Sequence, residues 1–175
     1  MKHSGVCMKK IIFIQGIHNP PERDEPLLEA IRSLGHEVQY FPMLYTLEES
    51  DKQLALIQDI NAFLEKQSDT FTILGHSFGG IISYSLRDDV YTKVDSIITV
   101  ASPHRVPFAW FKVILDKLPY KRNITVNDQR SYGFLFDRTV PFVFAKYENT
   151  QSFRLLWGRH NRILLDDSVV KEILV

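Results

Sequence analysis

The chain has 175 residues, which fits a single domain with room for a sizeable hydrophobic core. Apolar residues make up 45% and charged residues 24%, an ordinary balance for a water-soluble globular protein. Lys plus Arg and Asp plus Glu are equal at 21 each, so the net charge gives no reason to expect nucleic acid or an anionic membrane as a partner.

No apolar stretch reaches the roughly 18 residues that a membrane span needs, so we expect no integral membrane segment. The apolar run Ile11–Ile14 ends at Gln15-Gly16 and is too short for the core of a signal peptide. The single cysteine, Cys7, cannot form an internal disulfide, which favours a reducing, cytoplasmic setting. We expect residues 1–9 to be a flexible N-terminal extension and residues 10–175 to form one domain.

Strand-like and helix-like segments alternate along the chain, with short turns between them. Continuous apolar runs are typical of strands covered on both faces, and apolar repeats at every third or fourth residue are typical of helices. In chain order, the expected elements are a strand at 10–15, a helix between Pro20-Pro21 and the capping Gly35, a strand at 36–41, a helix after the capping-box segment Thr46–Glu49, and strands at 70–74 and 94–101. The rest of the chain predicts a helix at 106–118, strands at 130–136 and 152–157, and a closing helix at 166–175. This order indicates an α/β fold with a mostly parallel sheet.

The most informative motif is Gly75-His76-Ser77-Phe78-Gly79-Gly80, between the expected strand at 70–74 and a helix that continues through Ile81. A serine on a sharp strand-to-helix turn, with glycines two residues away on each side, is the G-x-S-x-G nucleophile elbow. The turn is so tight that side chains at the glycine positions would collide with the neighbouring strand and helix. The pattern alone recurs by chance, but the strand and helix around it make it a specific indication of a nucleophilic serine.

A serine hydroxyl needs an adjacent base, normally a histidine that a carboxylate holds in place. In folds with this elbow the partners follow in the order Ser, then Asp or Glu, then His. Of the six histidines, only His104 and His160 follow Ser77. A triad with His104 would need an acid before the fourth strand, where the opposite edge of the sheet should lie. We therefore predict that His160, in the loop after the strand at 152–157, is the base; a surface-loop histidine is the alternative.

The acid should follow the penultimate strand, and Asp137 stands immediately after it. Asp128 precedes that strand, at the wrong end of the sheet. Asp166 and Asp167 come after His160 and better suit the first turn of the last helix, where carboxylates complement the helix dipole. We therefore predict that Asp137 is the acid; an ordinary turn aspartate is the alternative.

An oxyanion hole needs two backbone N–H groups aimed at the developing negative charge. We expect one from Phe78, directly after the nucleophile, and the other from Ile17, in the loop after the first strand. Gly16 allows the backbone of that loop to come close. His18, in the same loop, is a candidate for the mouth of the substrate pocket, although a loop histidine without a role fits equally well.

The segment 103–121 is rich in large apolar side chains, among them Phe108, Trp110 and Phe111. They give more apolar surface than one buried helix face needs, so we expect a partly exposed helix beside an acyl site. An ordinary helix packed on the sheet is the alternative, because Trp and Phe also dominate cores.

These segments together resemble the α/β-hydrolase superfamily, and within it the small lipase-like enzymes that lack a large cap domain. The resemblance runs from Ile11 to about Val170 and rests on the Gln15-Gly16 loop, the elbow, Ala101–Arg105, Asp137–Pro141 and His160–Leu164. The Asp-x-x-Val-Pro segment is similar to the family's acid loop, and His-Asn-x-Ile-Leu is similar to its histidine loop. The chain departs from the family at Gln15, where the family often has histidine, and at Val106, where it usually has glycine.

The resemblance implies a minimal α/β-hydrolase fold: a three-layer sandwich with a mostly parallel sheet of about six strands and helices on both faces. It also implies hydrolysis of a small-molecule carboxylic ester through an acyl-enzyme, with no cofactor. The alternatives are a thioesterase or acyltransferase with the same triad, and a non-catalytic binding protein that keeps the fold. No zinc-ligand spacing and no phosphate-binding G-x-x-x-x-G-K-S/T occur in the sequence, so we expect no metal site.

Overall fold

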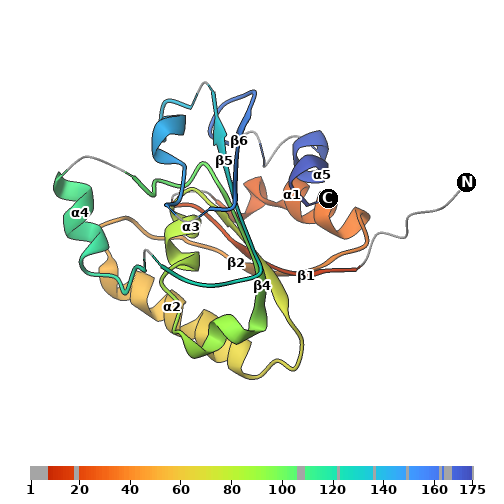
Figure 1. Cartoon of the computed structure of the whole chain (residues 1–175), viewed down its shortest axis with the longest axis horizontal. Helices are drawn as coiled ribbons and strands as arrows, with labels where there is room; N and C mark the ends of the chain where they lie inside the picture. Colours follow the sequence, from red (N-terminus) through yellow and green to blue (C-terminus); the bar gives the residue numbers. More distant parts are fainter. Residues whose placement is uncertain are drawn as a thin grey trace, which may run out of the picture.

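Figure 1 shows the computed structural model of the chain, which describes residues 8–17, 20–105, 109–121, 123–135, 137–148, 150–161, 163 and 167–174. Six parallel strands form one sheet in the order β2-β1-β3-β4-β5-β6. The strands are β1 (Lys10–Ile14), β2 (Glu37–Phe41), β3 (Phe71–His76), β4 (Val94–Val100), β5 (Asp128–Phe134) and β6 (Ser152–Leu156). The α-helices are α1 (Glu25–Ser33), α2 (Ser50–Glu65), α3 (Phe78–Ser83), α4 (Ala109–Leu115) and α5 (Asp167–Leu174), and the short 3-10 helices are η1 (Pro21–Arg23), η2 (Asp89–Lys93) and η3 (Phe142–Phe144).

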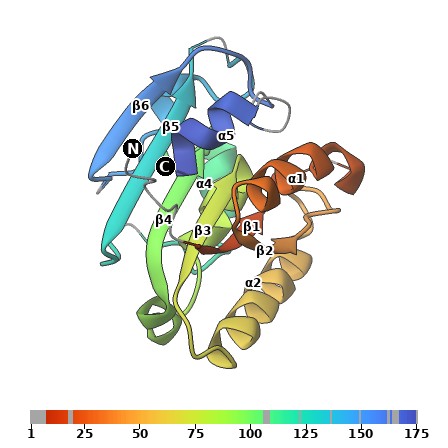
Figure 2. The same cartoon turned by 90° about the vertical axis from the view of Figure 1, so that its right-hand side faces the viewer.

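Each face of the sheet carries its own apolar layer, because adjacent residues on a strand point to opposite faces. On one face, Ile11 and Phe13 of β1 pack in a buried cluster with residues of α1 and α5. On the other face, Ile12 and Ile14 pack with residues of α2 and α3 and with Phe111 of α4. Figures 1 and 2 show α1 and α5 together over one face and α2 over the opposite one. The expected three-layer α/β architecture with a parallel sheet is therefore confirmed.

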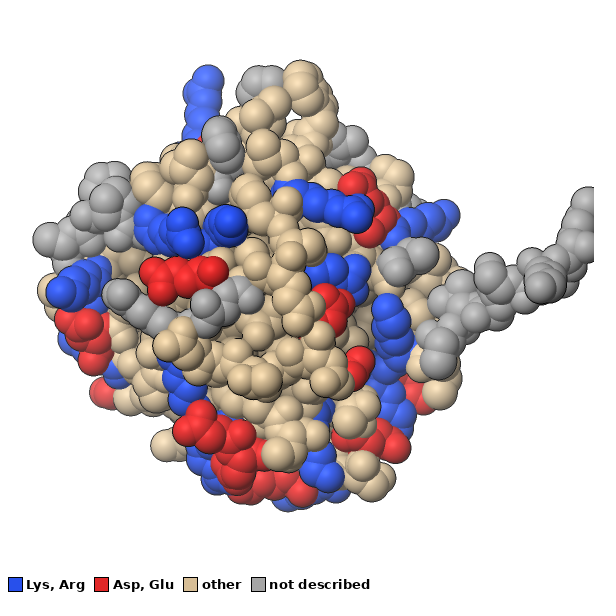
Figure 3. Space-filling model, in the orientation of Figure 1, with Lys and Arg blue, Asp and Glu red and all other residues tan. Residues whose placement is uncertain are grey.

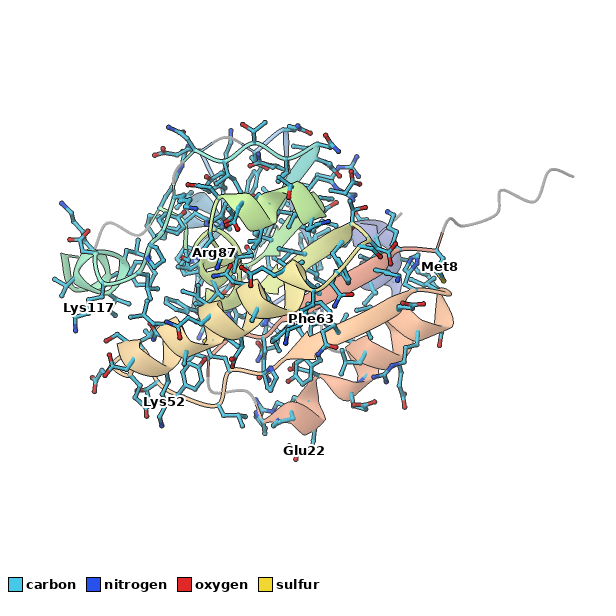
Figure 4. All side chains as sticks on the ribbon, turned by 90° about the horizontal axis from the view of Figure 1, so that it is seen from below. Met8, Glu22, Lys52, Phe63, Arg87 and Lys117 are labelled. Atoms are coloured by element: carbon cyan, nitrogen blue, oxygen red, sulfur yellow. The ribbon has the colours of Figure 1, made fainter. Side chains whose placement is uncertain are left out.

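Helix α2 covers one face of the sheet and is seen from below in Figure 4. Its Phe63 packs edge-on against Phe41 of β2 and Phe71 of β3, with ring centroids 5.8 and 5.5 Å apart. Before the helix begins, the carboxylate of Glu49 accepts a hydrogen bond from the backbone N–H of Thr46 at 2.8 Å. A capping box contains the same kind of bond, but here it precedes the helix, because the N-cap residue of α2 is Glu49 and not Thr46.

The boundaries of several elements differ from the sequence prediction. β3 continues through Gly75 and His76, so the strand ends at the residue directly before Ser77. Residues 106–108 of the helix expected at 106–118 lie outside the described residues, and the described helix α4 ends at Leu115. Gly35, which follows α1, has a φ of 82°, the left-handed conformation typical of a capping glycine.

Residues 1–7 of the expected N-terminal extension lie outside the described residues, which begin at Met8. The described end of that segment contacts the fold at Lys9. Its backbone N–H donates to Nδ1 of His36 at 3.2 Å, and its Nζ donates to the carbonyl of Leu174 at 2.8 Å. A flexible extension before these contacts stays a prediction.

The surface shown in Figure 3 carries Lys and Arg side chains interspersed with Asp and Glu side chains. The sequence has equal numbers of basic and acidic residues, and on this face the two kinds of side chain are also mixed in space. Among the described residues, no helix is long and apolar enough to cross a membrane.

Candidate active site

Ser77 stands on the turn between β3 and α3, with a φ of 53° and a ψ of −124°. A positive φ is rare for a residue with a side chain, and it marks a strained turn that surrounding contacts must hold. One such contact is the backbone N–H of Ser77, which donates to the carbonyl of Val100 on the neighbouring strand β4 at 2.8 Å. The serine therefore has the strained strand-to-helix geometry of a nucleophile elbow.

The glycines of the elbow lie where backbones come close together. A Cβ atom added at Gly75 would lie 2.7 Å from the Cα of Gly80, so the strand and the helix touch at these two residues. A Cβ at Gly79 would lie 2.1 Å from the carbonyl oxygen of Ile14, at the end of β1. A side chain at either position would thus separate α3 from β3 or from β1, as the motif predicts.

The loop after β1 lies against the nucleophile. A Cβ at Gly16 would lie 2.7 Å from the Cβ of Ser77 and 3.3 Å from its Oγ. Gln15 is fully buried, and its Oε1 accepts the backbone N–H of Met43 at 2.9 Å, which joins this loop to the segment after β2. The backbone at Ile17, the expected second oxyanion donor, is therefore on a loop held from both sides.

Asp137 and His160 follow β5 and β6, and the structure brings them together. Nδ1 of His160 lies 2.7 Å from Oδ2 of Asp137, whose side chain is fully buried. The other carboxylate oxygen, Oδ1, accepts the backbone N–H groups of Thr139 and Val140, both at 2.8 Å. Because a carboxylate oxygen accepts, Nδ1 of His160 donates the hydrogen in this contact.

Ser77, Asp137 and His160 follow the carboxyl ends of β3, β5 and β6, so all three lie at the same end of the parallel sheet. The candidate base also lies beside the elbow itself. Nε2 of His76 is 3.0 Å from the backbone carbonyl of His160, and the two imidazole ring centroids are 5.0 Å apart. Ligands of open α/β sheets bind at this carboxyl end of the strands.

The other downstream histidine, His104, is in a different environment. It is buried, and its two ring nitrogens contact hydroxyl groups, Tyr120 Oη at 3.1 Å and Thr99 Oγ1 at 3.2 Å. Burial lowers the pKa of His104 to about 3, so its ring is neutral at ordinary pH. The acid rejected from the sequence, Asp128, stands at the amino end of β5, where its Oδ2 contacts Ser96.

The structure describes only part of the expected substrate pocket. His18 and Phe108 lie outside the described residues, and so does the side chain of Trp110 on α4. Phe111 is 3% exposed and packs edge-on against Phe78, with ring centroids 6.3 Å apart. Helix α4 is therefore anchored on the residue that follows the nucleophile.

Two contacts of this site have no signal in the sequence: His76 with the backbone carbonyl of His160, and Gln15 with the backbone N–H of Met43. Each depends on which segments, far apart in the chain, meet at the carboxyl end of the sheet. Among the described residues, no group of three or more His, Cys, Asp or Glu side chains lies close enough together to hold a metal ion.

The sequence profile of the PGAP1-like alpha/beta domain matches residues 43–150, more than half of the chain. No curated protein sequence matches this chain. Among solved structures, the methylesterase protein MES16 from Arabidopsis is similar with a TM-score of 0.71 at 10% identity, over 95% of this chain and 98% of that one. Alpha/beta hydrolase domain-containing protein 10 from mouse is similar with a TM-score of 0.67 at 16% identity, over 94% of this chain and 86% of that one. Est1E from Butyrivibrio proteoclasticus is similar with a TM-score of 0.65 at 14% identity, over 94% and 86%. At these identities the likeness shows the fold alone, which is that of the α/β-hydrolases.

Proposed function

The chain belongs to the family of PGAP1-like alpha/beta domains, and from this premise we propose that it is a serine hydrolase that cleaves carboxylic esters through an acyl-enzyme on Ser77. The observation that carries the proposal is the 2.7 Å hydrogen bond between Asp137 and His160, which follow β5 and β6 at the same end of the sheet as Ser77, a serine with a φ of 53°. A buried carboxylate, an imidazole hydrogen-bonded to it through Nδ1, and an elbow serine are the three groups that this chemistry needs.

In the proposed reaction, Oγ of Ser77 attacks the ester carbonyl while Nε2 of His160 takes the hydroxyl proton. The same proton then passes from His160 to the leaving alkoxide, which departs as an alcohol. Asp137 keeps the imidazole in the Nδ1–H tautomer and stabilises the imidazolium that forms. Backbone N–H groups of Ile17 and Phe78 bind the developing oxyanion. A water molecule, activated by His160, then hydrolyses the acyl-enzyme.

Apolar side chains at the carboxyl end of the sheet support an ester with an apolar acyl group. Four large hydrophobic residues that are more than half exposed lie in segments that follow carboxyl ends of strands: Leu44 at 66%, Val113 at 57%, Val143 at 52% and Trp157 at 67%. Phe111 and Phe78 add a buried apolar wall next to the nucleophile. Large apolar side chains exposed at this end of the sheet are unfavourable in water unless they bind something apolar.

The nucleophile is tested with a fluorophosphonate probe, which reacts covalently with activated serines. We expect the wild-type protein to be labelled and Ser77→Ala to be unlabelled, with turnover of an activated ester lowered by about four to six orders of magnitude. Ser102→Ala is the matched control, because Ser102 is a buried serine that follows the neighbouring strand β4. A folded wild-type protein that resists the probe would contradict the proposal and favour a binding protein.

The acyl site is tested with esters and thioesters of short, medium and long acyl chains. We expect the rate to depend on acyl length, and Phe111→Ala to favour longer chains relative to shorter ones, because loss of the ring leaves more space for the acyl chain. Phe63→Ala is the control, since Phe63 packs against Phe41 and Phe71 on the same face of the sheet, away from the elbow. Equal rates at all lengths would rule out the acyl site, and a preference for thioesters would replace the ester assignment.

A cytoplasmic setting is also part of the proposal, since the single cysteine gives no disulfide within the chain. Cell fractionation with an antibody to the protein tests it directly. Recovery from an extracellular fraction would contradict it.

A further inference from the structure

His76 is the last residue of β3 and directly precedes Ser77 in the chain. Its side chain is fully buried, and its Nε2 lies 3.0 Å from the backbone carbonyl oxygen of His160, a residue 84 positions further along. The two imidazole rings are 5.0 Å apart between centroids and tilted by 45°. The residue before the candidate nucleophile therefore contacts the main chain of the candidate base.

The direction of this hydrogen bond follows from the acceptor. A carbonyl oxygen only accepts, so Nε2 of His76 carries the hydrogen and donates it. Burial, together with the nearby His160, lowers the pKa of His76 to about 3, so the ring is neutral at working pH. A neutral donor holds the carbonyl without adding a second positive charge beside the imidazolium that forms on His160 during turnover.

His160 is thus held at two separate points. Asp137 accepts from the ring and sets its tautomer, while His76 donates to the backbone and sets where the residue itself lies. The second contact matters because His160 stands in the loop after β6, the edge strand of the sheet, and a loop on an edge has fewer neighbours than a central strand. The hydrogen bond joins this loop to β3, a central strand that carries the nucleophile.

We propose that His76 is a positioning residue, which fixes the main chain of His160 to the nucleophile strand so that Ser77 and the base keep their mutual geometry. This inference rests on the proposed serine-hydrolase function. His76 itself does not touch the reacting atoms in this role. A displacement of about 1 Å between reacting groups can cost about a hundredfold in rate, so a hydrogen bond that sets the position of the base has a measurable effect.

The test compares two replacements of His76. His76→Phe keeps a ring but cannot donate, whereas His76→Gln places an amide N–H the same number of bonds from Cβ as Nε2 of histidine. We expect His76→Phe to lower kcat by about 10- to 100-fold with KM for a short ester nearly unchanged. We expect His76→Gln to recover most of that loss. Fluorophosphonate labelling should slow in parallel with kcat, since it depends on the same base.

The matched control is His104→Phe, which also removes a buried, neutral imidazole. His104 contacts Thr99 and Tyr120 instead of His160, so this variant should lose thermal stability and keep its kcat. All rates are measured at a temperature where circular dichroism shows each variant folded. If His76→Phe does not fold, His76→Asn replaces it, because its amide is one bond shorter and cannot reach the carbonyl of His160.

The outcomes separate this inference from the proposed function. A kcat of His76→Phe close to that of the wild type, with Ser77→Ala inactive, would overturn the positioning role and leave the hydrolase intact. Equal losses in His76→Phe and His76→Gln would also overturn it, since the donated hydrogen would then not matter. Unchanged activity and labelling in Ser77→Ala would instead remove the hydrolase assignment itself.

Discussion

At the scale of single residues, Gly79 and Gly80 lack room for a side chain for different reasons. A Cβ at Gly79 would lie 2.1 Å from the carbonyl oxygen of Ile14 and 2.7 Å from that of Gln15, which are backbone atoms. A Cβ at Gly80 would lie 2.0 Å from Oγ and 2.5 Å from Cβ of Ser102, which are side-chain atoms. Only the second conflict can be removed by changing another residue.

We therefore expect Gly79→Ala to lower the free energy of unfolding by about 3 kcal/mol, because α3 must move away from β1. Gly80→Ala should cost a similar amount, but Ser102→Gly in the same chain should recover part of it. Thr99 Cγ2, which would lie 3.2 Å from the new Cβ, limits the recovery. Urea unfolding of the single and double variants measures the coupling. An equal recovery of Gly79→Ala by Ser102→Gly would contradict this account.

Much of the candidate site is predictable from chain order at this scale. In a parallel sheet, the positions after successive strands meet at one edge, so Ser77, Asp137 and His160 can be singled out before any contact is known. The contacts of His76 and Gln15 cannot be predicted in this way. Each joins two segments that are far apart in sequence, and nothing in the local pattern states which segments meet.

At the scale of elements, the junction of α1 and β2 contains a buried carboxylate. Asp24, at the start of α1, has no exposed surface and accepts a hydrogen bond from the hydroxyl of Tyr40 on β2 at 2.5 Å. Its second oxygen, Oδ1, has no hydrogen-bond partner among the described residues. Burial raises the pKa of Asp24 from 3.8 to about 6, although the hydrogen bond from Tyr40 opposes this shift.

The folded pKa of Asp24 lies above the unfolded one, so the folded state holds this proton more tightly. The resulting stabilisation is complete below a pH of about 3.8 and is lost as the pH rises through about 6. The shift corresponds to about 3 kcal/mol. Asp24→Asn keeps a residue that suits a helix start and cannot ionise. Relative to the wild type, its free energy of unfolding should increase as the pH rises through this range, as measured by urea unfolding.

Tyr40→Phe is the companion variant, because it removes the hydroxyl that favours the ionised form of Asp24. The pH range over which stability is lost should then move upward. Parallel pH curves for the wild type and Asp24→Asn would show that the carboxylate does not titrate in this way.

The helices and strands differ in how well the sequence predicts them. The apolar stripes of α1 and α2 predict both helices, because burial of one face is what stabilises them. The sequence does not predict the 3-10 turn η3, since short turns carry little propensity of their own. Its Phe144 carbonyl accepts the backbone N–H of Arg105 at 3.1 Å, a contact with the segment after β4 that only the folded chain provides.

At the scale of the whole molecule, three buried histidines among the described residues make the fold sensitive to acid. They are His36, His76 and His104, which lie in separate parts of the structure. Burial lowers the pKa of each below 6.5, to about 3 for His76 and for His104. Below a pH of about 6.5, the unfolded chain therefore binds more protons at these histidines than the folded chain does. Their contribution to stability is complete above a pH of 6.5 and is lost as the pH falls toward about 3.

Between about pH 4 and pH 6, Asp24 stabilises the fold as the pH falls, whereas the histidines destabilise it. The free energy of unfolding of the wild type therefore sums two opposing effects. The histidine contribution is best measured in the Asp24→Asn background, where the free energy of unfolding should fall steadily as the pH is lowered from 6.5. Adding His104→Gln should reduce the slope of the free energy of unfolding against pH by the amount that corresponds to about one bound proton. One buried imidazole is then gone, while an amide remains to contact Thr99. Urea unfolding at several pH values gives both slopes. An unchanged slope would mean that His104 is already protonated in the folded protein, which its contacts with the hydroxyls of Thr99 and Tyr120 in a buried cluster disfavour.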